Sequence, residues 1–402
     1  MNTAPFTSLA DLARKAPESG IVEVMNRGRA RGGVLGLWAG EGDLPTPRFI
    51  IDAATRSMAA GETFYTWQRG IPELRQALAD WHAGLYGTAP DMERFTVTGS
   101  GMQAIQIAVE AVSDPGGRIL VPTPAWPNLA AAAGLRGAVV EAVPMRFAAS
   151  GWMLDREALA DAAARPGTAA IFVNSPSNPT GWVATREDQE FLLDLARRTG
   201  AWIIADEVYG LFVYDEAPSV PSPKGRRRAP SFHDIAEPDD RILFVNTFSK
   251  NWAMTGWRIG WIEAPAALGQ TMENLVQYST SGVAVFMQRA AIAALESGEG
   301  FLDHQIERTT RARGIIADAL EKTGRVRGAS PHGGFYAFFA LEGEKDSRAT
   351  ALRLIDEAAI GLAPGLAFGA GGEAFLRLCF ARDPAQISDA AERLTHWISA
   401  SL

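Results

Sequence analysis

The sequence predicts an α/β protein built on a parallel or mostly parallel sheet with helices on both faces, together with a smaller α+β domain. Short apolar runs alternate with longer helical patterns through the middle of the chain. Strands that are apolar on both faces belong to a parallel sheet that is covered on both sides. The five predicted strands span residues 94–98, 118–122, 169–173, 201–205 and 241–245.

The C-terminal part of the chain changes character, and this change predicts the smaller domain. Residues 335–339 and 374–380 read as strands among helices. The length of 402 residues also suggests more than one domain, because a domain usually has roughly 100–200 residues. We expect an N-terminal arm that joins the small domain (1–45), a large domain (46–285) and the C-terminal remainder of the small domain (286–402).

The composition excludes several classes of function. The net charge is -8, whereas general nucleic-acid binding rests on an excess of Lys and Arg. The single cysteine, Cys379, rules out a disulfide framework and a Cys-based metal site, and fits a reducing cytoplasm. Residues 1–20 lack the apolar core of a signal peptide, and no apolar stretch reaches the ~18 residues of a membrane span. The histidines are scattered, so we expect no metal site.

Polar or glycine residues follow nearly every predicted strand of the middle region. Ligands of open α/β sheets bind beyond the carboxyl ends of the strands. We therefore expect these separate segments to meet at one site. The segments are Gly99-Ser100-Gly101, Thr123-Pro124, Asn174-Ser175, Asp206-Glu207 and Asn246-Thr247.

The first of these segments predicts a phosphate site. Residues 99–104 follow a strand and open a helix predicted over 103–112, so their backbone N–H groups would point at an anion. The segment also matches G-x-G-x-x-A, the dinucleotide fingerprint, which requires an acid at the end of the next strand. That strand ends in Val121-Pro122-Thr123, without an acid. Phosphate binding is the favoured interpretation, and a dinucleotide or a structural turn remain the alternatives.

Lys250 follows the fifth strand, between hydroxyl residues and apolar ones. A lone lysine at such a place is usually solvated. In an apolar, cationic pocket its pKa would fall, and it would become a Schiff-base nucleophile. Arg258 could supply the cationic neighbour and a bidentate phosphate clamp. The hydroxyls of Thr247 and Ser249 are suitable phosphate donors.

Four further residues have both a structural and a functional interpretation. Asp206 could cap a helix, or it could pair with a cationic ring nitrogen and make that ring an electron sink. Tyr209 could turn its hydroxyl into the same site. Asn178 lies in a turn-rich loop, where its amide could donate to a phenolate-like oxygen. Trp126 could stack on a ring or pack in the core.

Taken together, these segments resemble the class I/II aminotransferases, which are fold-type I pyridoxal phosphate enzymes. The resemblance rests on three motifs in this order, together with Gly70-Ile71-Pro72-Glu73-Leu74-Arg75, and it covers residues 35–380. The chain departs from the family at Gly42, where a proline is frequent. The three motifs are Asn178-Pro179-Thr180-Gly181, Asp206-Glu207-Val208-Tyr209 and Ser249-Lys250-x-x-x-Met254-Thr255-Gly256-Trp257-Arg258-Ile259-Gly260.

The resemblance implies a homodimer with shared active sites, and a large domain whose seven-stranded sheet binds pyridoxal 5'-phosphate. It implies that Lys250 forms the Schiff base and shuttles a proton, that Asp206 pairs with the ring nitrogen, and that Tyr209 also acts in catalysis. It further implies cofactor contacts from the backbone of Ser100, Gly101 and Met102, from Trp126, Asn178, Thr247, Ser249 and Arg258, and from Tyr65 of the neighbouring subunit. The implied substrate contacts come from Arg377, which would grip the α-carboxylate, and from Asn178, Gly40 and Trp38.

The implied activity is the exchange of an amino group between an L-amino acid and a 2-oxo acid with ping-pong kinetics. A carbon–sulfur β-lyase or a related carbanion enzyme would share the same residues. A dinucleotide-dependent oxidoreductase has the support of residues 99–104 alone. The amino acid cannot be read from the sequence; one hypothesis is that Arg69 enters the partner's site and reads a second carboxylate.

Overall fold

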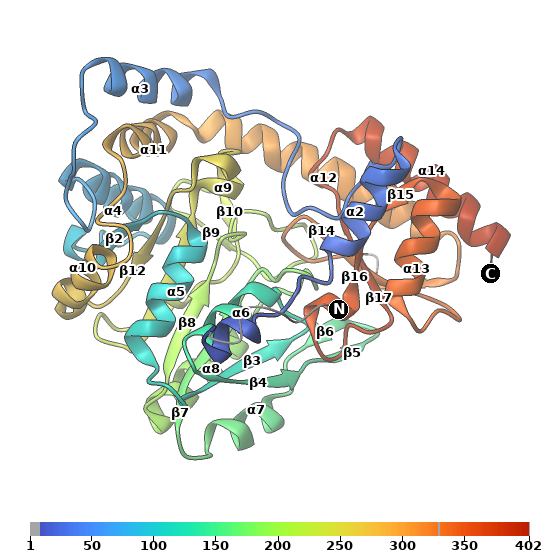
Figure 1. The fold of residues 1–402 in the computed structure, drawn as a ribbon, viewed down its shortest axis with the longest axis horizontal. Helices are drawn as coiled ribbons and strands as arrows, with labels where there is room; N and C mark the ends of the chain where they lie inside the picture. The colour runs from blue at the N-terminus through green and yellow to red at the C-terminus, as the bar shows by residue number, and fades with distance from the viewer. Residues whose placement is uncertain (1–8, 329, 402) are drawn as a thin grey trace.

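A seven-stranded sheet forms the centre of the molecule (Figure 1). The computed structural model describes residues 9–328 and 330–401. The sheet is parallel except for β12, which pairs antiparallel with both of its neighbours. The prediction of a mostly parallel seven-stranded sheet is therefore confirmed. In spatial order the strands are β2 (Phe95–Thr98), β12 (Gly260–Glu263), β11 (Ile242–Thr247), β8 (Trp202–Asp206), β7 (Thr168–Asn174), β3 (Arg118–Thr123) and β4 (Val139–Pro144).

Helices cover both faces of this sheet, because successive strand residues pack on opposite sides. Phe172 and Ile204 contact one helical layer, whereas Ile171 and Ile203 contact the other. The first layer consists of α5 (Gly101–Val112), α6 (Pro127–Leu135) and α10 (Gly269–Gln277), and the second of α7 (Arg156–Ala163) and α8 (Arg186–Thr199). This alternation is the reason why the strands read as apolar on both faces.

Two strands of the sheet were not predicted from the sequence. β4 is an edge strand whose residues are mostly exposed or half-buried, so it lacks the continuous apolar signal. β12 has four residues and follows directly on the motif that contains Lys250 and Arg258, where a strand is hard to distinguish from a loop.

A second, four-stranded sheet carries the C-terminal part of the chain, as the prediction of α+β structure required. Its order is β13-β14-β17-β16, and all pairs are antiparallel. The N-terminal β1 pairs with β15, so the start of the chain joins this part of the molecule. The strands are β1 (Leu35–Gly36), β13 (Val326–Arg327), β14 (Tyr336–Leu341), β15 (Ile360–Gly361), β16 (Ala363–Pro364) and β17 (Phe375–Cys379), and the helices are α2 (Val22–Arg31), α12 (Glu299–Glu321), α13 (Ser347–Arg353) and α14 (Pro384–Ser401).

The divisions at residues 45 and 285 remain a prediction. α11 begins at the second division and packs against α3 and α4, over the end of the large sheet that β2 and β12 form. The bounds of these helices are α3 (Arg48–Ala59), α4 (Pro72–Tyr86) and α11 (Val285–Ser297). The short elements that remain are α1 (Asp11–Arg14), α9 (Phe248–Asn251), β5 (Arg146–Ala148), β6 (Gly151–Met153), β9 (Val220–Pro221) and β10 (Arg227–Arg228).

Within the described part of the chain, no helix combines the length and apolarity that a bilayer crossing needs.

Gly260 fixes the contact between β12 and the start of α5. A methyl group there would lie 2.6 Å from the carbonyl oxygen of Asn246 and 2.9 Å from the amide nitrogen of Gly101. We expect Gly260→Ala to lower the free energy of unfolding by about 1–3 kcal/mol, as overpacking does. Gly314→Ala in α12 is the control. Its methyl group meets no atom within 4 Å, so stability should rise by up to ~1 kcal/mol. Urea denaturation measures the free energy of unfolding of both variants. Equal values for Gly260→Ala and Gly314→Ala would contradict the close packing at Gly260.

Candidate active site

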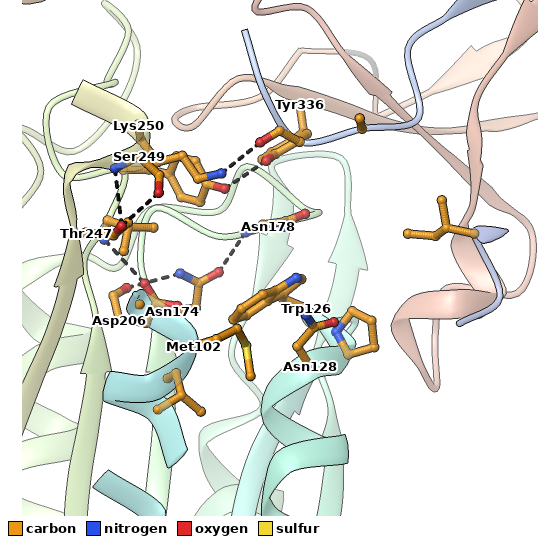
Figure 2. Close-up of a pocket in the computed structure, with 18 of the residues that line it drawn as sticks. Met102, Trp126, Asn128, Asn174, Asn178, Asp206, Thr247, Ser249, Lys250 and Tyr336 are labelled. Carbon is orange, nitrogen blue, oxygen red and sulfur yellow. Dashed lines mark hydrogen bonds between the residues drawn. The ribbon is translucent and has the colours of Figure 1, made fainter. Parts of the chain in front are cut away.

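A cavity of about 350 Å³ opens at the carboxyl ends of β7, β8 and β11 (Figure 2). Side chains from the large sheet form one side, and Trp38, Tyr336 and Arg377 come from segments of the smaller sheet's half of the molecule. Four of the five segments that were predicted to meet contribute to the lining, whereas Thr123-Pro124 does not. The cavity lining includes Gly101, Met102, Trp126, Asn174, Asn178, Asp206, Tyr209, Thr247, Ser249, Lys250 and Arg258.

The N-terminus of α5 lies at one end of this cavity. Ser100 is the N-cap residue, and its Oγ accepts a hydrogen bond from the amide nitrogen of Gln103 at 3.0 Å. Gly101 packs against Thr247, since a methyl group at Gly101 would lie 3.3 Å from the Thr247 Cβ atom. A close approach of this kind leaves the backbone N–H groups of the first turn accessible from the cavity. These groups and the helix dipole favour an anion.

Two hydroxyls and a guanidinium complete the anion site. The hydroxyl oxygens of Thr247 and Ser249 lie 2.9 Å apart. Arg258 has a left-handed backbone, with a φ angle of 53°, and its Nη1 donates to the carbonyl oxygen of Thr255 at 2.6 Å. This set of donors suits a phosphate dianion, whose oxygens accept several hydrogen bonds at once.

Lys250 is half-buried, and its amine lies within the cavity. Its Nζ donates to the carbonyl oxygen of Gly40 at 2.7 Å and lies 5.8 Å from the centroid of the Tyr209 ring. Burial, together with the nearby cation of Arg377, lowers the pKa of Lys250 to about 8, although Cys379, Asp206 and Glu41 act in the opposite direction. A lysine of this kind has a substantial neutral, nucleophilic fraction near neutral pH.

Asp206 is the last residue of β8 and is also buried. Its Oδ1 accepts a hydrogen bond from the amide nitrogen of Val208 at 3.3 Å, and its carbonyl oxygen accepts one from the side chain of Asn174 at 3.1 Å. Burial raises the pKa of Asp206 to about 7, although Lys250 and the Val208 amide act in the opposite direction. A cationic group placed against this carboxylate would lower its pKa again.

Tyr209 faces Tyr336 across the cavity. Their hydroxyl oxygens lie 2.8 Å apart, and the rings meet edge to face. Burial raises the pKa of Tyr209 well above its usual value, and Tyr336 raises it further, so the phenol stays protonated. Its hydroxyl is therefore available as a hydrogen-bond donor.

Arg377 is a rigidly held cation on β17. Its side chain is 3% exposed, and the guanidinium lies 4.7 Å from the Tyr336 ring centroid and 4.8 Å from that of Phe368. Nη1 donates to Oδ1 of Asn178 at 3.1 Å, and Nη2 donates to the carbonyl oxygen of Trp38. Its Nε is buried without a partner among the described residues. A planar cation held in this way suits a carboxylate.

The residues present fit pyridoxal phosphate. Asp206 is a buried acid that lacks a charged hydrogen-bond partner among the described residues, as a site for a protonated ring nitrogen requires. The start of α5 provides the phosphate cradle, and Lys250 provides the amine in the same cavity. Fold and cavity together define an enzyme that works through a phosphorylated aldehyde cofactor bound beyond the strand ends.

The chain belongs to the family of aminotransferases of class I and II, which matches residues 33–394. An aspartate aminotransferase from Thermotoga maritima is 32% identical over 91% of this chain and 92% of that protein. An arginine–pyruvate transaminase from Pseudomonas aeruginosa is 32% identical over 90% of this chain and 89% of its own length. The crystal structure of the T. maritima enzyme superposes with a TM-score of 0.88 at 30% identity, covering 97% and 100% of the two chains. The protein is thus a pyridoxal phosphate-dependent transaminase, and the dinucleotide interpretation of residues 99–104 is wrong.

Two predicted residues lie away from the cavity of their own subunit. Tyr65 is 95% exposed and projects from the loop between α3 and α4. Arg69 is 11% exposed, and its Nη1 donates to Glu93 at 2.9 Å. Arg69 also donates to the carbonyl oxygens of Glu93 and Phe95. This intrasubunit ion pair argues against the hypothesis that Arg69 reads a second carboxylate in the partner's site, which stays a prediction.

Gly40 and Trp38 contact the cavity mainly through their backbone. A methyl group at Gly40 would lie 2.4 Å from the Tyr336 hydroxyl, so only glycine fits beneath Lys250 and Tyr336. The indole of Trp38 packs into a slot of glycines, one of which is Gly361, where a methyl group would lie 1.7 Å from the ring.

Sequence reasoning missed several residues of the site. Asn174 was visible as a strand end; it accepts a hydrogen bond from the Asn178 amide at 2.8 Å and so orders the loop. Tyr336 carried no local signal, because its partner Tyr209 is 127 residues away. The histidines are also less scattered than they appeared. His82 and His233 each place a ring nitrogen 2.9 Å from Glu263.

The lowered pKa of Lys250 predicts how fast the apoprotein captures its cofactor. Because only the neutral amine attacks an aldehyde, the rate constant should rise with pH and level off above a pKa of about 8. Stopped-flow absorbance of pyridoxal phosphate mixed with apoprotein measures the rate. Nα-acetyl-lysine amide is the control, since its pKa is near 10.4 and its rate should still climb above pH 9. A protein profile that follows the control would contradict the burial of the amine.

Proposed function

We propose that this aminotransferase uses Lys250 as the lysine that holds the cofactor and then moves the substrate's Cα proton. Asp206 pairs with the ring nitrogen, and Arg377 binds the α-carboxylate of the substrate. The single observation that supports this assignment is the shared cavity, in which the amine of half-buried Lys250, a buried acid and a buried guanidinium face one space.

Pyridoxal phosphate supplies an aldehyde that captures amines and a ring that withdraws electrons from the substrate's Cα. The backbone of Ser100, Gly101 and Met102 holds the phosphate with Thr247, Ser249 and Arg258. Tyr209 and Asn178 donate to the ring hydroxyl, and Trp126 stacks on the ring. These roles agree with the position of each side chain around the cavity.

Lys250 suits proton transfer because its environment keeps the neutral form accessible. Its pKa of about 8 allows it to accept and return a proton near neutral pH. The carbonyl oxygen of Gly40 orients the amine. Asp206, at a pKa of about 7, becomes fully ionised when a cation lies against it.

Arg377 fixes the substrate relative to the lysine. The Tyr336 and Phe368 rings hold the guanidinium in one plane. Two carboxylate oxygens can then accept from it in parallel, which orients the Cα–H bond. The substrates are an amino acid and a 2-oxo acid, and one site serves both in turn.

The assembly we propose is a homodimer in the cytoplasm. Four large aromatic residues of the loop before α4 and of the end of α10 are exposed, by 82% for Phe64, 95% for Tyr65, 64% for Trp67 and 89% for Tyr278. Exposed aromatic clusters of this kind mark interaction sites. A second copy would cover them and receive the Tyr65 hydroxyl at its phosphate site.

Replacement of the lysine tests the assignment. We expect Lys250→Ala to lower kcat by at least about 10³-fold, as loss of a general acid–base does. Bound cofactor should remain visible but should no longer be fixed to the protein by borohydride. Lys224→Ala, in an exposed loop, is the control and should keep full activity. Full activity of Lys250→Ala would refute the assignment. Release of ammonia without an oxo acid would instead identify a lyase.

Replacement of the arginine tests the carboxylate site. We expect Arg377→Lys to raise KM for the amino acid and for the oxo acid by roughly 10–100-fold, because lysine cannot bind a carboxylate bidentately. Cofactor affinity, measured by fluorescence titration of the apoprotein, should change little. Arg393→Ala, at a half-buried position of α14 outside the cavity lining, is the control. An unchanged KM in Arg377→Lys would contradict the role.

A further inference from the structure

The cavity contains three cationic side chains among its described lining residues, and each has a task. Lys250 holds the cofactor, Arg258 lies at the phosphate end, and Arg377 binds the α-carboxylate. Arg377 is committed to the α-carboxylate, since Asn178, Trp38 and two enclosing rings hold its guanidinium in place and prevent it from turning to a second carboxylate. No described cation is left over for a second carboxylate.

Apart from the acid Asp206, the rest of the wall is apolar or uncharged. Ile21 and Met25, from the start of the chain, form one part. Met102, Trp126 and Asn128 lie together on the side away from Lys250 and Thr247 (Figure 2). Asn128 and Ser19 are the neutral polar groups of this region. A substrate side chain that extends from the α-carbon therefore meets aromatic, aliphatic and amide surface.

We propose that both substrates of this aminotransferase, the amino donor and the 2-oxo acid acceptor, carry an uncharged and mainly apolar side chain. The inference rests on the proposed function, because it takes Lys250, Arg258 and Arg377 as assigned there. A carboxylate that leaves water for a cavity without a free cation loses its hydration and gains no ion pair. Donor and acceptor bind in turn in the same cavity, so the restriction applies to both.

The arginines of α2 and of the loop before α4 do not supply the missing cation. Arg27 and Arg31 of α2 bind Asp356, outside the cavity. In the proposed dimer, the aromatic loop at Tyr65 approaches the partner's phosphate site, and the next cation along that loop, Arg69, is held by Glu93. A relative named aspartate aminotransferase would lead us to expect a second cation in the cavity, for the side-chain carboxylate of aspartate. The described lining residues provide no such cation.

Single-turnover half-reactions test the proposal with the holoenzyme. Each amino acid is mixed with the enzyme, and the loss of the cofactor's aldehyde absorbance gives a second-order rate constant. We expect leucine, methionine or phenylalanine to exceed aspartate and glutamate by at least about 100-fold, since polar mismatches in a desolvated site discriminate strongly. In the reverse half-reaction, the oxo acids of leucine and phenylalanine should exceed oxaloacetate and 2-oxoglutarate by a similar factor.

The outcomes separate this proposal from the function it rests on. If aspartate or glutamate reacts within tenfold of the best apolar donor, or a dicarboxylic oxo acid does so as acceptor, the substrate class is wrong and the aminotransferase assignment stands. If no amino acid of either class converts the cofactor, the proposed function fails and the substrate class fails with it.

A charge introduced into the wall provides the complementary test. We expect Met25→Arg to shift the ratio of the glutamate to the leucine rate constant upward by at least about tenfold, because it supplies the absent cation. Met25→Gln is the matched control and should leave the ratio within about threefold. Asn128→Arg repeats the experiment from the opposite wall, in case Met25→Arg does not fold. An unchanged ratio in both arginine variants would overturn the proposal.

Discussion

The burial of two ionisable groups in one cavity is the constraint on which the site depends. Lys250 and Asp206 both lose hydration, and this loss moves the pKa of the amine down to about 8 and the pKa of the acid up to about 7. Both groups thereby approach neutral pH, where small changes in their surroundings decide their charge. Desolvation of Asp206 costs free energy in the empty protein, and in the proposed arrangement a bound cationic ring would offset that cost.

The adjacent acids Asp206 and Glu207 point to opposite sides and have different partners. Asp206 ends β8 and faces the cavity, whereas Glu207 turns to the other side and accepts a hydrogen bond from the Ser231 hydroxyl at 2.7 Å. Ser231 in turn contacts His233, and His233 contacts Glu263. The two glutamates raise the pKa of His233 to about 9 against its burial, so this network is balanced by its own charges. Asp206 remains the acid that is left for a ligand.

The site residues that could be predicted from the sequence are those that follow a strand of the large sheet. Asp206 ends an apolar run, and Asn178 and Lys250 lie in the short segments that follow β7 and β11, so their meeting follows from parallel topology. Arg377 and Tyr336 lie within strands of the other sheet, and no local pattern distinguishes them from core residues. Their position depends on the antiparallel register of β14 with β17 and on how the two halves pack. The ion pair of Arg69 with Glu93 could not be predicted from the sequence either, because the two residues meet only in the folded chain.

The contact between the two halves of the molecule sets the shape of the cavity as well as its chemistry. Gly40 lies at this contact, with its carbonyl oxygen on the Lys250 amine and no room for a methyl group beside the Tyr336 hydroxyl. Tyr336 meets Tyr209 from the large sheet and also stacks on Arg377. One tyrosine thus links the residues proposed for the cofactor with the residue proposed for the substrate. A shift of one half against the other would move the carboxylate site and the ring site together, so the geometry of proton transfer is set by domain packing rather than by any single side chain.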